Sequence, residues 1–351
     1  MIDVKQIDVI APNFKKRMSG VTSTVIRLVP LQARDIAIAA TGPKLPKDVP
    51  QFAPLRLLTM GRRGPNGFRV WHARRNSEML PGIVLKYLLG KRLKLVFTSA
   101  AQRRHSTYTR WLIRRMDAVI ATSAQSAAYL EVPHTVIHHG IDTEAFSPST
   151  NKAVVRQKLG LPEDATLVGC FGRIRPQKGN DLFVDAMLRL LPRHKNAVAV
   201  MMGGVTDQFQ DFAHELAQKV KSAGLEDRFL ILREAPDWEI TQYFQALDLY
   251  VAPQRWEGFG LTPLEAMACA VPVVATRVGA FEELIADQET GHLINIEDVD
   301  AMVSATDTLL SSVEVREKYA RAARARAVGH FGIEGEAQAI IDVYTDLLGT
   351  S

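Results

Sequence analysis

Short apolar runs alternate with helical patterns along most of this 351-residue chain. The runs are rich in β-branched residues and carry no charged side chain, as in TLVGCF (166–171) and AVAVMM (197–202). Between them lie segments such as NDLFVDAMLRLLPRH (180–194), in which apolar residues recur at spacings of three and four. Strands that are apolar on both faces and separated by helices predict parallel sheets with helices on both sides.

The alternation restarts near residue 166, after a polar stretch that contains proline (142–165). We therefore predict two tandem Rossmann-like, doubly wound α/β domains facing a cleft, with boundaries at 1–150 and 151–330. The last segment, 331–351, has the apolar spacing of a helix and is expected to cross back to the N-terminal domain. The expected strands are 6–13, 35–42, 55–61, 69–74, 93–100, 118–123 and 134–140, then 166–173, 197–204, 228–235, 249–254, 271–278 and 292–296.

The turn after the strand expected at 166–173 contains two cations and two glycines, in GRIRPQKGND (172–181). Ligands of doubly wound folds bind beyond the carboxyl ends of the strands. Arg173 supplies a rigid fork of donors and Lys178 a compact charge, a pair suited to a diphosphate. The helix N-terminus that follows also attracts anions. These features favour a phosphate site over a merely exposed basic turn.

Two glutamates, Glu257 and Glu265, stand in QRWEGFGLTPLEAMAC (254–269). Thr262 and Pro263 are typical of a helix start, with Thr at the N-cap, which puts Glu265 in the capping-box position. Glu265 has two interpretations, a helix cap or an acceptor for both hydroxyls of a ribose.

A capping role does not explain Glu257 or the glycines beside it. Gly258 and Gly260 leave backbone amides open to a closely approaching ligand, and a helix dipole there favours anions. A carboxylate at Glu257 is suited to accept hydrogen bonds from sugar hydroxyls. This turn is therefore expected to bind a sugar and a phosphate together.

These motifs resemble those of a known enzyme family. The E-x7-E spacing of Glu257 and Glu265, the G-R-x4-K-G run at 172–179, and the downstream PVVATRVGAFEELI and ETGHLI are similar to GT-B retaining glycosyltransferases of family 4. The resemblance covers essentially the whole chain and is strongest over 166–296. It implies transfer of a sugar from a nucleotide diphosphate sugar to an acceptor hydroxyl, with retention at the anomeric carbon.

The resemblance also implies roles for particular residues. Arg173 and Lys178 would hold the donor diphosphate in place of a metal, so that no metal or other cofactor is required, and Glu257 would contact the transferred sugar. The amides of residues 259–261 would cradle sugar and phosphate, and residues 232–234 fall where the family holds the nucleobase. The donor-binding residues implied in this way are Gly20, Gly172, Arg233, Gly258, Phe259, Gly260, Leu261 and Glu265.

The N-terminal half matches the family pattern less closely. Where relatives have a glycine loop before a helix, this chain has one glycine, Gly20, preceded by Ser19, which is either a helix cap or a ligand contact. The family histidine after a central strand is replaced at the strand exit by Thr98-Ser99. Either His105 reaches in from the loop as a catalytic residue or that role is absent. His72 is a second candidate at a strand end.

The positive charge is concentrated in the N-terminal half. Residues 79–116 contain nine Lys and Arg residues and no Asp or Glu, and the cations flank apolar and aromatic side chains. This patch is either a solvated helix face or a surface that faces a membrane. The N-terminus lacks the pattern of a signal peptide, so we expect a cytoplasmic protein, peripheral on the inner face of the membrane.

The sequences of residues 252–284 and 97–124 resemble those of rhizobial-type lipopolysaccharide core mannosyltransferases. That resemblance implies GDP-mannose as donor and the Kdo inner core of an anionic glycolipid as acceptor. Alternatives are a UDP-sugar donor for another surface polysaccharide, or a sugar-nucleotide epimerase of the same fold. The pI of 9.2 suggests nucleic acid as a possible partner. The sequence has only 7% aromatic residues and no recognised nucleic-acid-binding module, so we expect no such partner.

Overall fold

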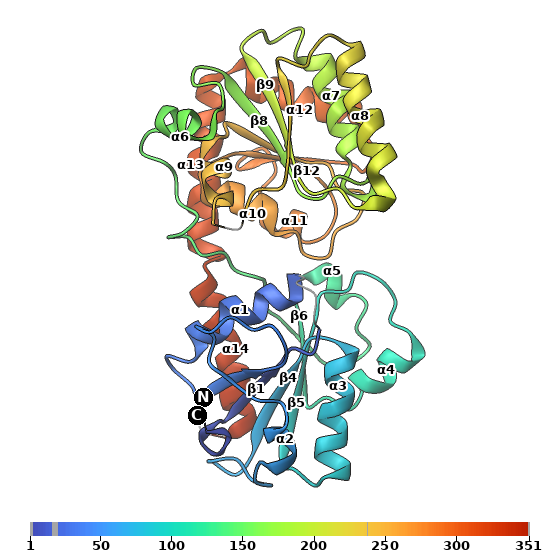
Figure 1. Ribbon diagram of the computed structural model, residues 1–351, viewed down its shortest axis with the longest axis vertical. Coiled ribbons are helices and arrows are strands. Elements are labelled where there is room, and N and C mark those ends of the chain that lie inside the picture. Colours follow the sequence, from blue (N-terminus) through green and yellow to red (C-terminus); the bar gives the residue numbers. More distant parts are fainter. Residues whose placement is uncertain (1–2, 16–19, 237, 350–351) are drawn as a thin grey trace. The chain divides into compact units, whose positions relative to one another are not determined.

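The computed structural model describes residues 3–15, 20–236 and 238–349. They form two compact units, each with its own parallel sheet (Figure 1). Unit 1 comprises Met1–Gly140 and Ile333–Ser351, and unit 2 comprises Ile141–Gly332.

Unit 1 is built on a seven-stranded sheet with the order β3-β2-β1-β4-β5-β6-β7, in which all neighbours are parallel. The central strands are buried on both faces because helices cover both sides (Figure 1). The strands are β1 (Val9–Pro12), β2 (Ile38–Thr41), β3 (Gln51–Phe52), β4 (Arg69–Ala73), β5 (Leu93–Ser99), β6 (Ala118–Ala121) and β7 (Thr135–Val136).

The helices of unit 1 include one that the chain contributes from its C-terminal end. This helix, α14 (Ile333–Leu348), packs on α1 and β4. The others are η1 (Val4–Gln6), α1 (Gly20–Gln32), α2 (Arg56–Thr59), α3 (Asn76–Ile83), the π-helix η2 (Val84–Leu88), α4 (Thr107–Ile113) and α5 (Ala124–Ala127).

Unit 2 has a six-stranded parallel sheet with the order β10-β9-β8-β11-β12-β13. The strand order reverses between β8 and β11. In doubly wound folds, ligands bind beyond the carboxyl ends of the strands at such a reversal. The strands are β8 (Thr166–Phe171), β9 (Ala197–Met202), β10 (Phe229–Leu232), β11 (Leu249–Ala252), β12 (Val273–Thr276) and β13 (Gly291–Ile294).

Two apolar cores, one on each face of the sheet, hold unit 2 together. The expectation of parallel sheets covered on both sides is therefore confirmed. The helices are α6 (Lys152–Leu159), η3 (Pro176–Lys178), α7 (Asn180–Leu190), η4 (Asp207–Phe209), α8 (Gln210–Ser222), α9 (Ile240–Ala246), α10 (Leu261–Ala268), α11 (Phe281–Leu284), α12 (Val299–Ser311) and α13 (Val313–His330).

One predicted strand is wrong. Residues 55–61 form the short helix α2 instead, and the edge strand β3 precedes it. Leu57 and Met60 point into the core at a spacing of three, whereas Leu55 and Leu58 are exposed. An apolar run of this length fits one helical turn as well as a strand, and its exposed leucines exclude a central strand.

The change from unit 1 to unit 2 falls at Gly140, earlier than the boundary we predicted at residue 150. The segment after Gly140 is attached to unit 2 by Arg324, whose Nη1 donates to the carbonyl oxygens of Thr143 (3.0 Å) and Phe146 (2.8 Å). Asp142 closes the local turn by accepting from the amides of residues 144 and 145.

The two cysteines, Cys170 and Cys269, are free and buried, as their apolar surroundings predicted. Burial raises the pKa of each thiol to about 12. Among the helices of the described part of the chain, none has the length and apolarity to cross a membrane.

Candidate active site

The basic turn after β8 is fixed by backbone contacts with both neighbouring strand exits. The amide of Gly172 donates to the carbonyl oxygen of Met202 at 2.9 Å, beyond the last residue of β8. A Cβ on Gly203 would lie 1.8 Å from the oxygen of Gly172, and a Cβ on Gly179 would lie 1.9 Å from the oxygen of Pro253. Only glycine permits backbones to approach so closely. The turn is therefore held between the exits of β9 and β11.

Lys178 and Glu257 meet at this turn, although 79 residues separate them in sequence. Their side chains form an ion pair, and each is 19% exposed. The second carboxylate oxygen of Glu257 accepts from the amide of Gly258 at 3.0 Å. Arg173, on the same turn, is exposed. The structure thus brings together a cation from the exit of β8 and a carboxylate from the exit of β11.

The side chain of Glu257 packs closely against the backbone of Gly260 and Gly279. A Cβ on Gly260 would lie 2.9 Å from Cγ of Glu257 and 2.2 Å from the ring of Phe281. A Cβ on Gly279 would lie 3.3 Å from Cβ of Glu257. Both glycines have positive φ, at 87° and 64°. The glycine-rich turn is therefore shaped around the Glu257 side chain.

Arg255 is a residue of the site that the sequence pattern did not reveal. Its guanidinium donates to both carboxylate oxygens of Asp181, at 2.8 and 2.7 Å, and to the carbonyl oxygen of Pro176 at 2.5 Å. Burial opposes ionisation of Asp181, but the hydrogen bonds from Arg255 outweigh it and keep the pKa of that carboxyl below its ordinary value. Arg255 therefore clamps the turn that carries Lys178 onto the segment that carries Glu257.

The predicted capping box at Thr262 and Glu265 is wrong. Helix α10 begins at Leu261, and Gly260 occupies the N-cap without a side-chain cap bond. The left-handed conformation of Gly260 starts the helix two residues earlier than predicted, and Thr262 bonds to the hydroxyl of Tyr250. Pro263 still falls in the first turn, where its missing N–H costs nothing. Thr262 is therefore not the N-cap of α10, and Glu265 lies in the second turn of the helix.

Comparison with known proteins gives the family. A family model for glycosyl transferases group 1 matches residues 151–326. Over 99% of its length the chain is 52% identical to lipopolysaccharide core biosynthesis mannosyltransferase LpsB of Rhizobium meliloti (strain 1021), and the match covers 100% of that protein. The chain belongs to the group 1 glycosyltransferases. This glycosyltransferase is also 50% identical, over 99% of both chains, to lipopolysaccharide core biosynthesis mannosyltransferase LpcC of Rhizobium leguminosarum bv. viciae.

A solved structure supports the fold of the glycosyltransferase. Anabaena Alr3699/HepE, crystallised in complex with UDP, superposes with a TM-score of 0.84 at 22% identity, covering 97% of this chain and 100% of that chain. Together with the two parallel α/β sheets, this likeness confirms the prediction of a GT-B fold.

Arg233 and Gly20 are two further predicted donor-binding residues of the glycosyltransferase, one in each unit. Arg233 follows β10 and is exposed, and Glu234 beside it lies 2.7 Å from the place of a Cβ on Gly204. In unit 1, Gly20 opens α1 with nothing within 4 Å of an added Cβ. Ser19 lies outside the described residues.

His105 of the glycosyltransferase lies in unit 1, in the loop between β5 and α4. Its Nε2 is 3.4 Å from Oγ of Ser99, the last residue of β5. Burial and the nearby charge of Arg103 lower its pKa. His105 thus lies next to the strand exit, within reach of the edge where the family histidine was expected.

His72 is a structural residue of the glycosyltransferase core. It is fully buried, with Nδ1 2.5 Å from the Tyr344 hydroxyl and Nε2 2.6 Å from Oγ1 of Thr98. These bonds join β4 to α14 and β5. Burial, and to a lesser degree the charge of Arg74, place the pKa of His72 well below its ordinary value. The ring therefore stays neutral in the folded protein and contributes to packing.

His72→Gln is expected to weaken the pH dependence of stability on the acid side. Below about pH 6.5 the unfolded chain protonates this histidine and the folded chain does not, so stability falls as the pH falls. Each such group adds up to about 1.4 kcal/mol per pH unit to that slope. Glutamine retains hydrogen-bonding groups but cannot titrate.

The measurement is the free energy of unfolding between pH 7 and 5 for the wild type and for His72→Gln. The pKa values of His105 and His292 are lowered as well, so a residual slope is expected in the variant. Equal slopes in the two proteins would contradict the assignment.

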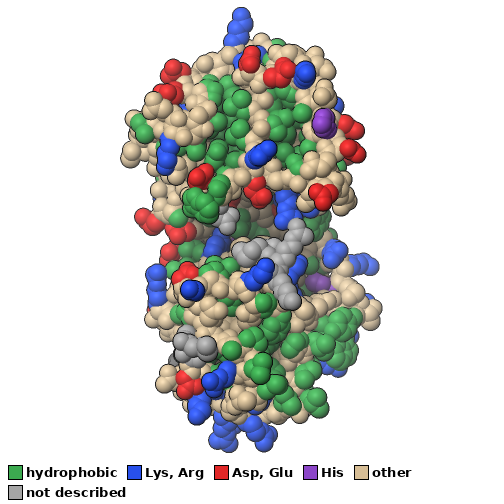
Figure 2. All heavy atoms as spheres, in the orientation of Figure 1, with side chains coloured by type: hydrophobic (Ala, Val, Ile, Leu, Met, Phe, Trp, Pro, Cys, Tyr) green, Lys and Arg blue, Asp and Glu red, His purple; other side chains and the backbone are tan. Residues whose placement is uncertain are grey.

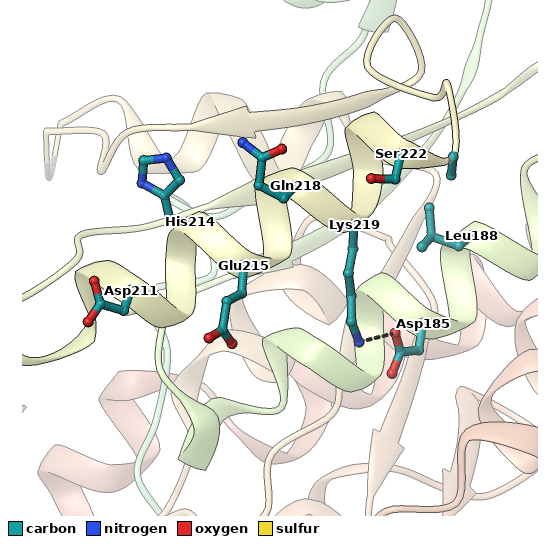
Figure 3. A pocket seen from close by; sticks show the side chains of 9 residues that line it. Asp185, Leu188, Asp211, His214, Glu215, Gln218, Lys219 and Ser222 are labelled. Atoms are coloured by element: carbon teal, nitrogen blue, oxygen red, sulfur yellow. Dashed lines mark hydrogen bonds and ion pairs between the residues drawn. The ribbon is translucent and has the colours of Figure 1, made fainter.

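A broad hollow on unit 2 is not part of this site. It lies between α7 and α8, where Lys219 donates to Asp185 at 2.9 Å (Figure 3). None of the predicted site residues lines it. The lining residues are Asp185, Leu188, Asp211, His214, Glu215, Gln218, Lys219, Ser222 and Ala223.

Proposed function

We propose that this glycosyltransferase moves mannose from GDP-mannose, with retention at the anomeric carbon, onto the Kdo inner core of a lipopolysaccharide precursor. The names of two relatives support mannose and the lipopolysaccharide core, since both are core mannosyltransferases at 50% identity or more over 99% of the chain. The GDP donor and the Kdo acceptor go beyond those names and follow from the sequence resemblance.

The observation that carries the catalytic part of the proposal is the Lys178–Glu257 ion pair at the reversal point of the unit 2 sheet. In a sugar diphosphate, the diphosphate is suited to a cation and the sugar hydroxyls are suited to a carboxylate, and this pair supplies both groups side by side. Lys178, with the exposed Arg173, would bind the diphosphate, and Glu257 would accept hydrogen bonds from the sugar hydroxyls.

The remaining donor contacts surround this pair. The backbone around the start of α10 would contact sugar and phosphate, and the helix dipole there favours the anion. Glu265, in the second turn of α10, would bind the ribose, and Arg233 would lie near the base. The proposed contacts at the start of α10 are Gly258, Phe259, Gly260 and Leu261.

In the proposed reaction, the bond between the anomeric carbon and the phosphate oxygen breaks as the acceptor oxygen forms its bond on the same face. The acceptor proton passes to the leaving phosphate oxygen. Glu257 takes part in no covalent step, because one oxygen contacts Lys178 and the other accepts from Gly258. Negative charge that grows on the diphosphate is offset by Lys178 and Arg173, so we propose a reaction that needs no metal.

We further propose an anionic glycolipid as acceptor and a position on the inner face of the cytoplasmic membrane. The exposed cations of unit 1 support this proposal, because they are suited to the phosphate and carboxylate groups of such a lipid.

The test is transfer of radiolabelled sugar to a Kdo-bearing lipid acceptor, with GDP-mannose, UDP-glucose and UDP-galactose offered separately. We expect transfer from GDP-mannose, and no transfer from it would contradict the proposal. Transfer from a UDP-sugar alone would favour the alternative donor, and conversion of a nucleotide sugar without acceptor would favour an epimerase.

GDP is expected to stabilise the protein against heat. At about 100 times its Kd, a ligand that binds only the folded state adds about 2.7 kcal/mol to the free energy of unfolding. The melting temperature with GDP is compared with that with UDP at equal concentration. An increase with UDP only would contradict the choice of donor.

A further inference from the structure

Exposed apolar side chains are concentrated on one part of unit 1. Of the eighteen large hydrophobic side chains that are exposed among the described residues, nine lie between residues 55 and 111. Figure 2 shows hydrophobic side chains gathered over the α3 side of this unit, with Lys and Arg side chains at its lower end. We call these nine the apolar surface: Leu55, Leu58, Leu80, Val84, Tyr87, Leu88, Leu89, Tyr108 and Trp111.

One stripe of the apolar surface runs along α3 and the π-helix η2. Its exposed apolar side chains are Leu80 on α3 and Val84, Tyr87 and Leu88 on η2. Tyr87 is 63% exposed and Leu88 is 77% exposed. One apolar face of this helical segment is buried in the core and a second is exposed. An exposed apolar face of this kind marks a site of contact with another protein or with a membrane.

A second stripe lies on α4 and is aromatic. The rings of Tyr108 and Trp111 are nearly parallel, with an interplanar angle of 14° and centroids 6.3 Å apart. The guanidinium of Arg115 lies 3.8 Å from the Trp111 ring centroid. Trp and Tyr with a nearby Arg are the side chains enriched where a bilayer meets water.

The helices that carry the apolar surface are neighbours in unit 1. Asn76 at the start of α3 donates to Oγ1 of Thr109 on α4 at 2.7 Å. Lys91, just after η2, donates to the carbonyl oxygens of Leu58 (3.2 Å) and Met60 (2.5 Å) at the end of α2. The three helices are therefore held beside one another by hydrogen bonds within unit 1.

The charges around the apolar surface are positive. Between residues 51 and 116 the sequence has a single acidic residue, Glu78, which is buried and paired with Arg75. Two acidic residues farther along the chain form ion pairs with some of the cations. Asp117 pairs with Lys86, and Glu131 pairs with Arg110 and Arg114. The exposed cations are Arg56, Arg62, Arg63, Arg92, Arg103, Arg104 and Arg114.

We propose that the apolar surface docks unit 1 onto a bilayer that contains anionic phospholipid. Tyr87, Leu88 and Trp111 would enter the interface, and the surrounding arginines would contact lipid phosphates. Exposed apolar side chains and exposed cations in the same part of unit 1 match an apolar layer covered by anionic headgroups. The proposal deepens the proposed function by naming the surface that meets the membrane, and for its biological purpose it rests on that function.

The test is co-sedimentation of the full chain with phosphatidylcholine vesicles, with and without about 30 mol% phosphatidylglycerol. We expect binding that requires phosphatidylglycerol. The variant Tyr87→Ser, Leu88→Ser, Trp111→Ser is expected to bind at least tenfold more weakly, because it removes the side chains that would be buried. A matched control replaces three exposed apolar residues of unit 2, Val154, Trp238 and Val328, by serine and is expected to bind as the wild type does.

Tryptophan fluorescence tests insertion directly. A Trp238→Phe, Trp256→Phe variant retains Trp111 and the buried Trp71, so a blue shift on adding anionic vesicles reports Trp111 entering the bilayer. Binding without a blue shift, equal losses in the matched control, or no binding would each overturn the proposal. Loss of a vesicle-free dimer in the triple serine variant would assign the surface to a second copy of the chain instead.

The outcomes separate this proposal from the proposed function. The triple serine variant is expected to transfer sugar to a water-soluble Kdo acceptor as the wild type does, and to be impaired only on acceptor in vesicles. Vesicle binding without any transfer from GDP-mannose would refute the donor and leave the docking surface standing.

Discussion

Lys178→Ala is expected to lower turnover about 100-fold, whereas nucleotide binding falls much less. Removing one preorganised donor that stabilises charge in the transition state costs about 3 kcal/mol. Lys178 fits this role because it lies on a turn held by glycines and by Arg255, and its cation faces Glu257. The measurement is kcat for sugar transfer, alongside Kd for GDP by calorimetry.

The control for this variant is Lys219→Ala, since Lys219 is a lysine of the same unit whose ion pair with Asp185 lies on the α7–α8 hollow. It is expected to retain wild-type turnover. The melting temperature of both variants shows whether they are folded. A folded Lys178→Ala protein with unchanged turnover would contradict the role of the residue.

Gly260→Ala is expected both to destabilise unit 2 and to abolish most activity. A left-handed conformation costs a residue with a Cβ about 1–2 kcal/mol, and crowding against the Phe281 ring adds about 1–3 kcal/mol. The new methyl group also lies 2.9 Å from Cγ of Glu257 and forces that side chain to move. A shift of this kind in a side chain that positions the transferred sugar reduces turnover about 100-fold.

Gly160→Ala is the matched control, since Gly160 has a φ of 65° and nothing within 4 Å of an added Cβ. It therefore carries the backbone strain without the crowding. We expect it to lower the free energy of unfolding by about 1 kcal/mol and to leave turnover unchanged. Denaturant unfolding and kcat are measured for both variants. Equal effects would show that Gly260 has no particular relation to Glu257.

The sequence was informative where local pattern and topology coincide. Unbroken apolar runs such as 166–171 and 197–202 form central strands, as predicted. The motifs at 172–181 and 254–269 follow two of these strands. Because β8 and β11 turned out to be neighbours at the reversal of strand order, the two motifs meet at one place.

The errors have local physical causes. The apolar run at 55–61 is too short for its pattern to distinguish a helical turn from a strand. Only the structure, in which Leu55 and Leu58 are exposed, shows that the segment is not a central strand. At α10, the pattern T-P-x-E matched a capping box, but the φ of Gly260 set the first residue of the helix. A backbone angle of this kind is determined by packing, here against Phe281, that no local pattern reveals.

Contacts between distant residues were beyond the sequence argument. The clamp from Arg255 to Asp181 joins positions 74 residues apart, and neither residue stood out from its neighbours in the motifs. His72 was a site candidate because it lies near the end of a predicted strand. Only the fold places it in the core, against Tyr344 from the last helix.

The central claim is that Lys178 and Arg173, at the exit of β8, hold the diphosphate of the donor. A crystal structure of the chain with GDP-mannose or GDP bound tests it most directly. The account predicts phosphate oxygens within hydrogen-bonding distance of Nζ of Lys178 and the guanidinium of Arg173. A diphosphate bound elsewhere, with both cations facing solvent, would contradict it.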